Sequence, residues 1–208
     1  SPYLSHPSMT QSQSSQSPAA TSGRSSSGRA SSGSLAARLD RPIVLVGLMG
    51  VGKTTVGRRL ADALGRSFVD VDHEIERAAD RTVSEIFATH GEAYFREGER
   101  RVVARLMGEK AGVIATGGGA FVDAETRALI LDKGIAVWLD CDLETLVERT
   151  SRRNTRPLLR GGDPAKILAE LKEQRSDSYA QAHIHIVTDD GPHHRTVSRI
   201  IEAIDAWL

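Results

Sequence analysis

The chain has 208 residues, and its 27 Lys and Arg residues are balanced by 27 Asp and Glu residues. This balance gives no excess of positive charge that would predict nucleic-acid binding. No apolar stretch approaches the roughly 18 to 20 uncharged residues that cross a bilayer, so we expect no membrane partner. The single cysteine, Cys141, cannot form an internal disulfide. We therefore expect a soluble protein in a reducing compartment, and we predict the cytoplasm.

The first 39 residues differ in composition from the rest of the chain. Ser1 to Leu39 is rich in Ser, Gln, Gly, Pro and Ala, and it contains neither Asp nor Glu. It shows no hydrophobic periodicity that would compensate the entropy lost on ordering, so we predict a disordered tail over residues 1–39. Its arginines in an acid-free setting also fit an organellar transit peptide, which would place the protein in an organelle instead. Residues 40–208 are predicted to form one domain.

Short apolar segments within this domain predict strands, and the intervals between them are long enough for helices. The alternation predicts the α/β class, with a parallel sheet covered by helices on both faces. The predicted strands are Ile43–Val46, Phe68–Val71, Val113–Ala115, Ala136–Leu139 and Ile184–Val187.

Several helix starts carry local sequence signals. Thr82 with Glu85 forms a capping-box pattern, and Asp163 followed by Pro164 is typical of an N-cap before a first-turn proline. Asp123 and Asp142 precede two further segments that we expect to be helical.

A glycine-rich loop directly follows the first predicted strand. Residues Gly47 to Thr54 read Gly-Leu-Met-Gly-Val-Gly-Lys-Thr, which matches the phosphate-loop pattern G-x-x-x-x-G-K-[ST]. In such a loop the backbone N–H groups point at phosphates, while Lys53 supplies a cation and Thr54 a hydroxyl for Mg²⁺. An ordinary glycine-rich turn is the alternative, but the flanking strand and helix favour nucleotide binding.

Two carboxylates follow the second predicted strand. Side chains at i and i+2 of a strand lie on one side, so Asp70 and Asp72 are expected at the carboxyl edge of the sheet, where ligands bind. One can hold Mg²⁺, and the other can accept a hydrogen bond or a proton from a substrate hydroxyl. Alternatively, Asp72 caps a helix that begins at His73.

Three consecutive glycines, Gly117 to Gly119, follow the third predicted strand. The absence of side chains would let a ligand lie against the backbone, although a flexible turn is the alternative. Arginines outside the phosphate loop are a further signal, and each alone is more commonly a solvated helix charge. Residues 149–162, however, combine five arginines with a proline and a glycine pair, which is typical of a mobile lid over phosphates.

Together these motifs resemble shikimate kinases in their order and spacing. The shared motifs are the phosphate loop, Asp-x-Asp, Phe-Arg, Gly-Gly-Gly and Arg-Pro-Leu-Leu, and the similarity extends from Arg41 to Leu208. The resemblance implies a three-layer sandwich with a five-stranded parallel sheet, as in nucleoside monophosphate kinases. It further implies ATP-dependent phosphorylation of the 3-hydroxyl of shikimate, a step in chorismate and aromatic amino-acid biosynthesis, by a monomer with one Mg²⁺ ion.

The resemblance also assigns roles to single residues. ATP would be bound by Gly50, Val51, Gly52, Lys53, Thr54, Thr55, Arg149 and Arg156, and the metal by Thr54 and Asp70. Shikimate would be bound by Asp72, Arg96, Gly118, Gly119 and Arg175, of which Arg96 and Arg175 would clamp its carboxylate. Asp72 would bind the reacting hydroxyl, Arg156 would reach the transferring phosphate and Arg149 would lie against adenine. Asp72, Lys53 and Arg156 would be the catalytic residues.

The sequence departs from the family pattern after Arg175, where Asp177 and Ala180 replace a usual proline and glutamate. The imidazoles at His183, His185, His193 and His194 are expected to be exposed and not to form a metal site. Two other functions stay open: another small-acceptor kinase, such as a gluconate or nucleotide kinase, and a non-catalytic module that binds ATP as a conformational signal.

Overall fold

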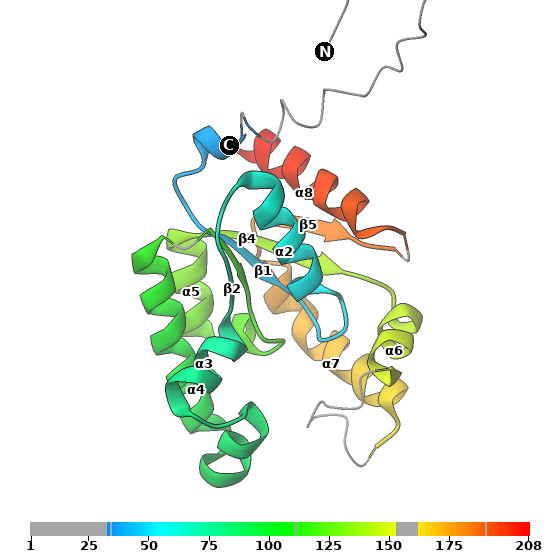
Figure 1. Cartoon of the computed structure of the whole chain (residues 1–208). Coiled ribbons are helices and arrows are strands. Elements are labelled where there is room, and N and C mark those ends of the chain that lie inside the picture. The colour runs from blue at the N-terminus through cyan, green and yellow to red at the C-terminus, as the bar shows by residue number, and fades with distance from the viewer. Residues whose placement is uncertain (1–32, 34, 111, 153–161, 190) are drawn as a thin grey trace, which may run out of the picture.

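The structure is a computed structural model that describes residues 33, 35–110, 112–152, 162–189 and 191–208 (Figure 1). Five parallel strands form a single sheet in the order β2-β3-β1-β4-β5. The strands are β1 (Ile43–Val46), β2 (Phe68–Asp70), β3 (Val113–Ala115), β4 (Ile135–Asp140) and β5 (Ile184–Val187). The predicted fold class and all five predicted strands are therefore confirmed, with shifts of one residue at the ends of β2 and β4.

Helices cover both faces of this sheet. The helices are α2 (Lys53–Leu64), α3 (Val71–Ala79), α4 (Val83–Glu109), α5 (Ala124–Lys133), α6 (Leu143–Ser151), α7 (Pro164–Tyr179) and α8 (His193–Trp207), with a short 3₁₀ turn at Ala120–Val122. Helices α2 and α8 pack against each other on one face, while α5 contacts β4 from the other. Connections between parallel strands are right-handed, so the face that a helix covers depends on the direction in which the chain moves across the sheet. The chain moves in one direction from β1 to β2 and in the opposite direction afterwards, and helices therefore cover both faces.

The inner strands β1 and β3 are apolar and buried along their whole length because both of their faces are covered. Val44 is flanked in register by Ile114 of β3 and Ala136 of β4, and all three side chains are fully buried. Such continuous burial is typical of parallel sheets. Because all strands run the same way, the loops that follow β1, β2 and β3 meet at one edge of the sheet.

The predicted helix starts are observed. Thr82 accepts a hydrogen bond from the backbone N–H of Glu85, and Asp163 accepts one from Ala165 at the start of α7. Asp123 and Asp142 cap α5 and α6 in the same way. Each cap satisfies a backbone donor that the helix itself leaves unpaired.

Strand β2 ends at Asp70, one residue earlier than predicted, and this changes the positions of Asp70 and Asp72. Helix α3 begins at Val71, and its N-cap is Asp70, which accepts a hydrogen bond from His73 N at 3.3 Å. Asp72 therefore lies in the first turn of α3. The prediction that both carboxylates project from one strand is wrong, and so is the alternative in which Asp72 is the cap.

Helix α4 contains a break that the sequence analysis did not anticipate. Gly91 has φ of 82° and ψ of 177°, so the element consists of two helical pieces, 83–90 and 92–109. Glycine adopts this left-handed φ without steric cost, and such residues are common causes of sharp kinks. The second piece carries Phe95 and Arg96.

The predicted tail ends earlier than residue 39. Residues 35–38 form a helical turn, and the side chains of Leu35 and Leu39 are only 0% and 7% exposed. Arg66 donates to the carbonyl oxygens of Ala36 and Leu39 at 2.6 and 3.0 Å. The prediction of disorder is therefore wrong for residues 35–39, because the composition of the long segment concealed two leucines that share one face. Residues 1–32 and 34 lie outside the described part of the chain.

This packing predicts that the leucines contribute to stability. Leu35→Ala should lower the free energy of unfolding by about 2 to 4 kcal/mol, since it removes a fully buried side chain. Urea denaturation followed by circular dichroism measures the change, and Leu208→Ala, at a position that is 43% exposed, is the control. Equal stability of the two variants would contradict the docking of this segment.

Candidate active site

The phosphate loop joins β1 to α2 and depends on glycines. Gly47 has φ of 142°, and a Cβ atom there would lie 2.4 Å from the carbonyl oxygen of Leu139. Gly52 has φ of 96° and is the N-cap of α2. These positions fit glycine alone, and the resulting curve directs the start of α2 toward the space above the sheet edge.

Lys53 runs back along this loop. Its side chain is buried, and Nζ donates to the carbonyl oxygens of Gly47 and Leu48 at 2.6 and 2.9 Å. Its ammonium group is thus held within the loop, where it can meet the phosphates of a nucleotide.

A cavity of about 310 Å³ opens beside the loop. Most residues predicted to bind ATP or metal line it, namely Gly50, Gly52, Lys53, Thr54, Thr55, Asp70 and Arg149. We call it the nucleotide cavity. Val51 was also predicted to bind the nucleotide, but its side chain is buried at 2% exposure, so only its backbone remains for contacts at the loop.

Thr54 and Asp70 meet at this cavity. Thr54 Oγ1 donates to Asp70 Oδ2 at 3.0 Å. A hydroxyl and a carboxylate oxygen are hard donors of the type that Mg²⁺ prefers, and this ion usually takes few protein ligands besides phosphates and water. The pair therefore fits a magnesium ion bound with a nucleotide.

Arg149 closes one side of the nucleotide cavity. It belongs to α6, and its guanidinium donates to the carbonyl oxygens of Val51 at 3.0 Å and of Asp189 at 3.3 Å. It therefore ties the phosphate loop to the segment that leads from β5 to α8. The predicted lid over 149–162 begins within α6, which ends at Ser151, and Arg156 lies outside the described residues.

A second cavity, of about 320 Å³, adjoins the first. All residues predicted to bind shikimate line it, namely Asp72, Arg96, Gly118, Gly119 and Arg175, and its apolar walls come from Met49, Val83, Phe87 and Phe95. We call it the acceptor cavity. Asp72 and Gly117 line both cavities, so the carboxylate of Asp72 lies at their junction.

The three glycines after β3 have a more specific role than predicted. A Cβ atom on Gly117 would lie 2.8 Å from Asp72 Oδ1, and one on Gly118 would lie 3.1 Å from Arg175 Nη1. On Gly119 it would lie 2.1 Å from Arg96 Nη2. Each glycine therefore makes room for one charged side chain of the protein itself, whereas the sequence suggested room for a ligand.

The structure adds Glu99 to the site, which the sequence analysis missed. Its carboxylate is fully buried in the acceptor cavity wall, and Oε1 accepts from Arg96 Nη1 at 2.8 Å. Burial raises the pKa of Glu99 to about 7, against the lowering influence of Arg96. The signal was present as an Arg and a Glu three residues apart on one helix, a spacing that brings the two side chains together.

Arg175 reaches the acceptor cavity from α7. Its Nη1 atom is buried and has no hydrogen-bond partner among the residues that the structure describes. Tyr179, one turn later, is fully buried and donates its hydroxyl to the carbonyl oxygen of Gly118. Arg96 and Arg175 thus present guanidinium groups from two different helices to one apolar-walled space, an arrangement that suits a carboxylate.

The histidines divide into two groups. His185 and His194 are exposed, as predicted. The prediction of exposure is wrong for His183, which is half-buried and accepts a hydrogen bond from Ala136 N at 3.0 Å through Nδ1. It is also wrong for His193, which is half-buried and lines the nucleotide cavity.

Known proteins resemble the chain in sequence and in structure. The family model described as shikimate kinase matches residues 49–205. A shikimate kinase of Novosphingobium aromaticivorans is 59% identical over 178 residues, which cover 84% of this chain and 92% of the relative. The chain belongs to the shikimate kinase family. A shikimate kinase of Caulobacter vibrioides is 57% identical over 170 residues, which cover 82% of this chain and 85% of that protein.

A solved shikimate kinase has the same fold. The structure of the shikimate kinase from Acinetobacter baumannii in complex with shikimate superposes with a TM-score of 0.77 at 42% identity, covering 80% of this chain and 93% of that one. The departures from the family pattern at Asp177 and Ala180 do not displace Arg175, whose guanidinium lies in the acceptor cavity. Within the described residues no helix is long and apolar enough to cross a membrane.

The buried carboxyl of this shikimate kinase family member predicts a pH-dependent stability. Because the pKa of Glu99 is about 7 when folded and near 4.5 when unfolded, its contribution to stability is fully present below pH 4.5 and is lost as the pH rises through 7. Glu99→Gln removes this titration. Relative to the variant, the original protein should lose on the order of 2 kcal/mol of unfolding free energy between pH 5 and pH 8.

Urea denaturation of both proteins at the two pH values measures this difference. Glu97→Gln is the matched control, since Glu97 lies on the same helix but its side chain is 58% exposed. A gap between Glu99→Gln and the original protein that stays constant with pH would show that Glu99 remains ionised throughout.

Proposed function

We propose that the chain transfers the γ-phosphate of ATP to the 3-hydroxyl group of shikimate, giving shikimate 3-phosphate and ADP. The observation that carries this proposal is the position of Asp72 on the boundary between the nucleotide cavity and the acceptor cavity. Direct phosphoryl transfer requires the donor phosphate and the acceptor hydroxyl to lie side by side, and a carboxylate at the boundary can reach the hydroxyl.

The nucleotide side of the site would act through positioning and charge. The phosphates of ATP would lie on the backbone of residues 50–55, at the start of α2, with Lys53 close to the β- and γ-phosphates. Arg149, which is already fixed by two carbonyl oxygens, would lie against the adenine end. Arg156 is proposed from the sequence to meet the charge that develops on the transferring phosphate.

The acceptor side fits a small ring that carries a carboxylate. Phe87, Phe95 and Val83 offer apolar contacts to the carbon face of a ring, while Arg96 and Arg175 each offer a guanidinium fork to the carboxylate. Arg96 already donates a hydrogen bond to Glu99, so its side chain would lose less conformational freedom when the acid binds. Because Gly118 and Gly119 have no Cβ atom, the guanidinium groups of Arg175 and Arg96 can lie directly beside the backbone.

Asp72 would accept a hydrogen bond from the acceptor hydroxyl and orient it toward the γ-phosphate. As phosphorus–oxygen bond formation proceeds, the hydroxyl proton would pass to the carboxylate of Asp72. The geometry allows this because Gly117 carries no side chain where Asp72 Oδ1 lies. Asp72 is therefore the residue that joins binding of the acceptor to chemistry.

Thr54 and Asp70 would hold one magnesium ion, which would neutralise charge on the β- and γ-phosphates. Asp70 has a second task, because it also caps α3, the helix that carries Asp72. Asp70 would therefore position both the magnesium ion and, through α3, the carboxylate of Asp72. We further propose that the protein acts as a monomer, because residues of a single copy line both cavities. We also propose that it acts in the cytoplasm.

The two alternative functions receive less support. Gluconate is an open-chain acid that would leave the apolar walls of the acceptor cavity poorly filled, and a nucleotide acceptor would need space for a base and a sugar. A module that only binds ATP would not need a carboxylate at the boundary with a second cavity.

An acceptor panel tests the proposal. With ATP and Mg²⁺ present, ADP release followed by a coupled assay should require shikimate, whereas gluconate and nucleoside monophosphates should not support it. Asp72→Asn serves as the control against contaminating kinases, and its turnover should fall by about 100-fold or more. Faster turnover with gluconate than with shikimate would overturn the acceptor, and ADP release without any acceptor would overturn the kinase mechanism.

A further inference from the structure

His193 is a cavity residue that none of the assignments above uses. It is the first residue of α8, and its half-buried side chain lines the nucleotide cavity together with Gly52 and Arg149. A Cβ atom built on Gly52 would lie 3.9 Å from His193 Cε1 and 3.6 Å from Arg149 Nη1. The imidazole therefore lies beside the last glycine of the phosphate loop, where the amides of the loop turn toward phosphates.

The surroundings of His193 suit an anion. Helix α8 has 15 residues, carries no acidic side chain in its first turn and, within the described residues, has no side chain that caps it. Its N-terminal N–H groups therefore contribute a positive potential at His193. Arg149 lies nearby and donates hydrogen bonds to the carbonyl oxygens of Val51 and Asp189. It thereby connects the phosphate loop to the segment that precedes α8.

We propose that His193 is a further nucleotide-binding residue, whose imidazole hydrogen-bonds the phosphate chain of ATP or ADP on the side of the nucleotide cavity formed by Arg149. The inference rests on the proposed function for the identity of the nucleotide. It adds a contact from α8, which lies far along the chain from the phosphate loop and packs against α2 (Figure 1).

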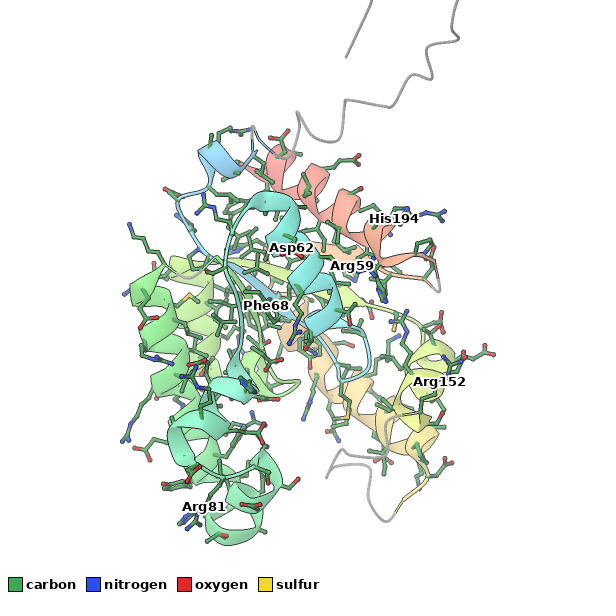
Figure 2. The ribbon with its side chains drawn as sticks, viewed as in Figure 1. Arg59, Asp62, Phe68, Arg81, Arg152 and His194 are labelled. Carbon is green, nitrogen blue, oxygen red and sulfur yellow. The ribbon has the colours of Figure 1, made fainter. Side chains whose placement is uncertain are left out.

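Electrostatics give this contact a signature. Burial, Arg149 and Arg59 lower the pKa of His193, so its neutral form predominates near neutral pH. Arg59 lies on α2, next to the first turn of α8 (Figure 2). Of the other charged residues that line the cavity, Lys53 and Arg152 add positive charge, and Asp70 and Asp72 add negative charge.

A bound nucleotide would change the sign of the field at the imidazole. Two or more negative charges of ADP would favour the protonated form and raise the pKa of His193, so binding would take up protons near pH 6.5. By linkage, affinity for ADP should fall as the pH rises through the pKa of His193 in the complex. A merely structural histidine would not produce this coupling.

The adjacent His194 provides a matched control. It carries the same side chain in the same helical turn but is exposed, and Figure 2 shows it directed away from the body of the protein. It does not line the nucleotide cavity. Any effect of a generic histidine substitution at the start of α8 should therefore appear in both variants.

Calorimetric titration of the full chain with ADP tests the proposal without any acceptor. At pH 6.5, His193→Ala should weaken ADP binding roughly three- to tenfold, the value of one ordinary hydrogen bond, because the site is partly exposed. His194→Ala should change it less than about twofold. Titrations in two buffers with different ionisation enthalpies should detect proton uptake in the original protein and in His194→Ala, but not in His193→Ala.

The possible outcomes separate this inference from the proposed function. Equal ADP affinity and equal proton uptake in His193→Ala and His194→Ala would overturn the role of His193 and leave the kinase assignment in place. Failure of the original protein to bind ADP would instead overturn the proposed function. Circular dichroism melting of each variant distinguishes a lost contact from lost folding.

Discussion

The site depends on how closely three charged side chains approach the backbone after β3. Asp72 from α3, Arg96 from α4 and Arg175 from α7 each occupy space that a Cβ atom on Gly117, Gly119 or Gly118 would take. Because the glycines lie at the carboxyl edge of the central part of the sheet, three separate helices converge on one short segment. The backbone conformation of this segment does not require glycine, since none of the three residues has positive φ. Steric room, and not chain flexibility, is therefore what these glycines provide.

Charge is then distributed unevenly between the two cavities. The nucleotide cavity places Lys53 and Arg149 around the phosphate loop, so an anion can be neutralised on several sides. In the acceptor cavity, the positive charge of Arg96 is paired with the carboxyl group of Glu99, which is itself fully buried. Glu99 is costly to ionise there, and burial raises its pKa to about 7, so near neutral pH it offsets the charge of Arg96 only in part. Arg96 Nε also lies 3.6 Å from Oε1 of Glu92, whose side chain is largely exposed. In the proposed function, a carboxylate on the acceptor would add to the neutralisation of Arg96 and would favour binding of an acid over a neutral polyol.

Much of this could be predicted from the sequence, for identifiable physical reasons. Parallel strands buried on both faces give continuous apolar runs, caps such as Thr82 are local, and the phosphate loop is a contiguous pattern. Features that depend on three-dimensional proximity were missed. Asp70 is the cap in place of Asp72, and composition does not separate Leu35 from a polar tail. The spacing of Arg96 and Glu99 pairs the two side chains but does not show that Glu99 is buried in a cavity wall. The sequence predicts an exposed His193, because nothing in its own helix reveals the phosphate loop that lies beside it.

The most direct test of the account is the substitution Gly117→Ala, assayed with ATP and shikimate. Its new Cβ atom would lie 2.8 Å from Asp72 Oδ1 and would displace the carboxylate that joins the two cavities. The account predicts a loss of about 100-fold in kcat, the scale expected for a misplacement of roughly 1 Å, with ADP affinity within about twofold of the original value. Gly108→Ala, where no atom lies within 4 Å of the added Cβ, should leave both quantities unchanged. A folded Gly117→Ala protein with undiminished kcat would contradict the central role given to Asp72 and to the space beside it.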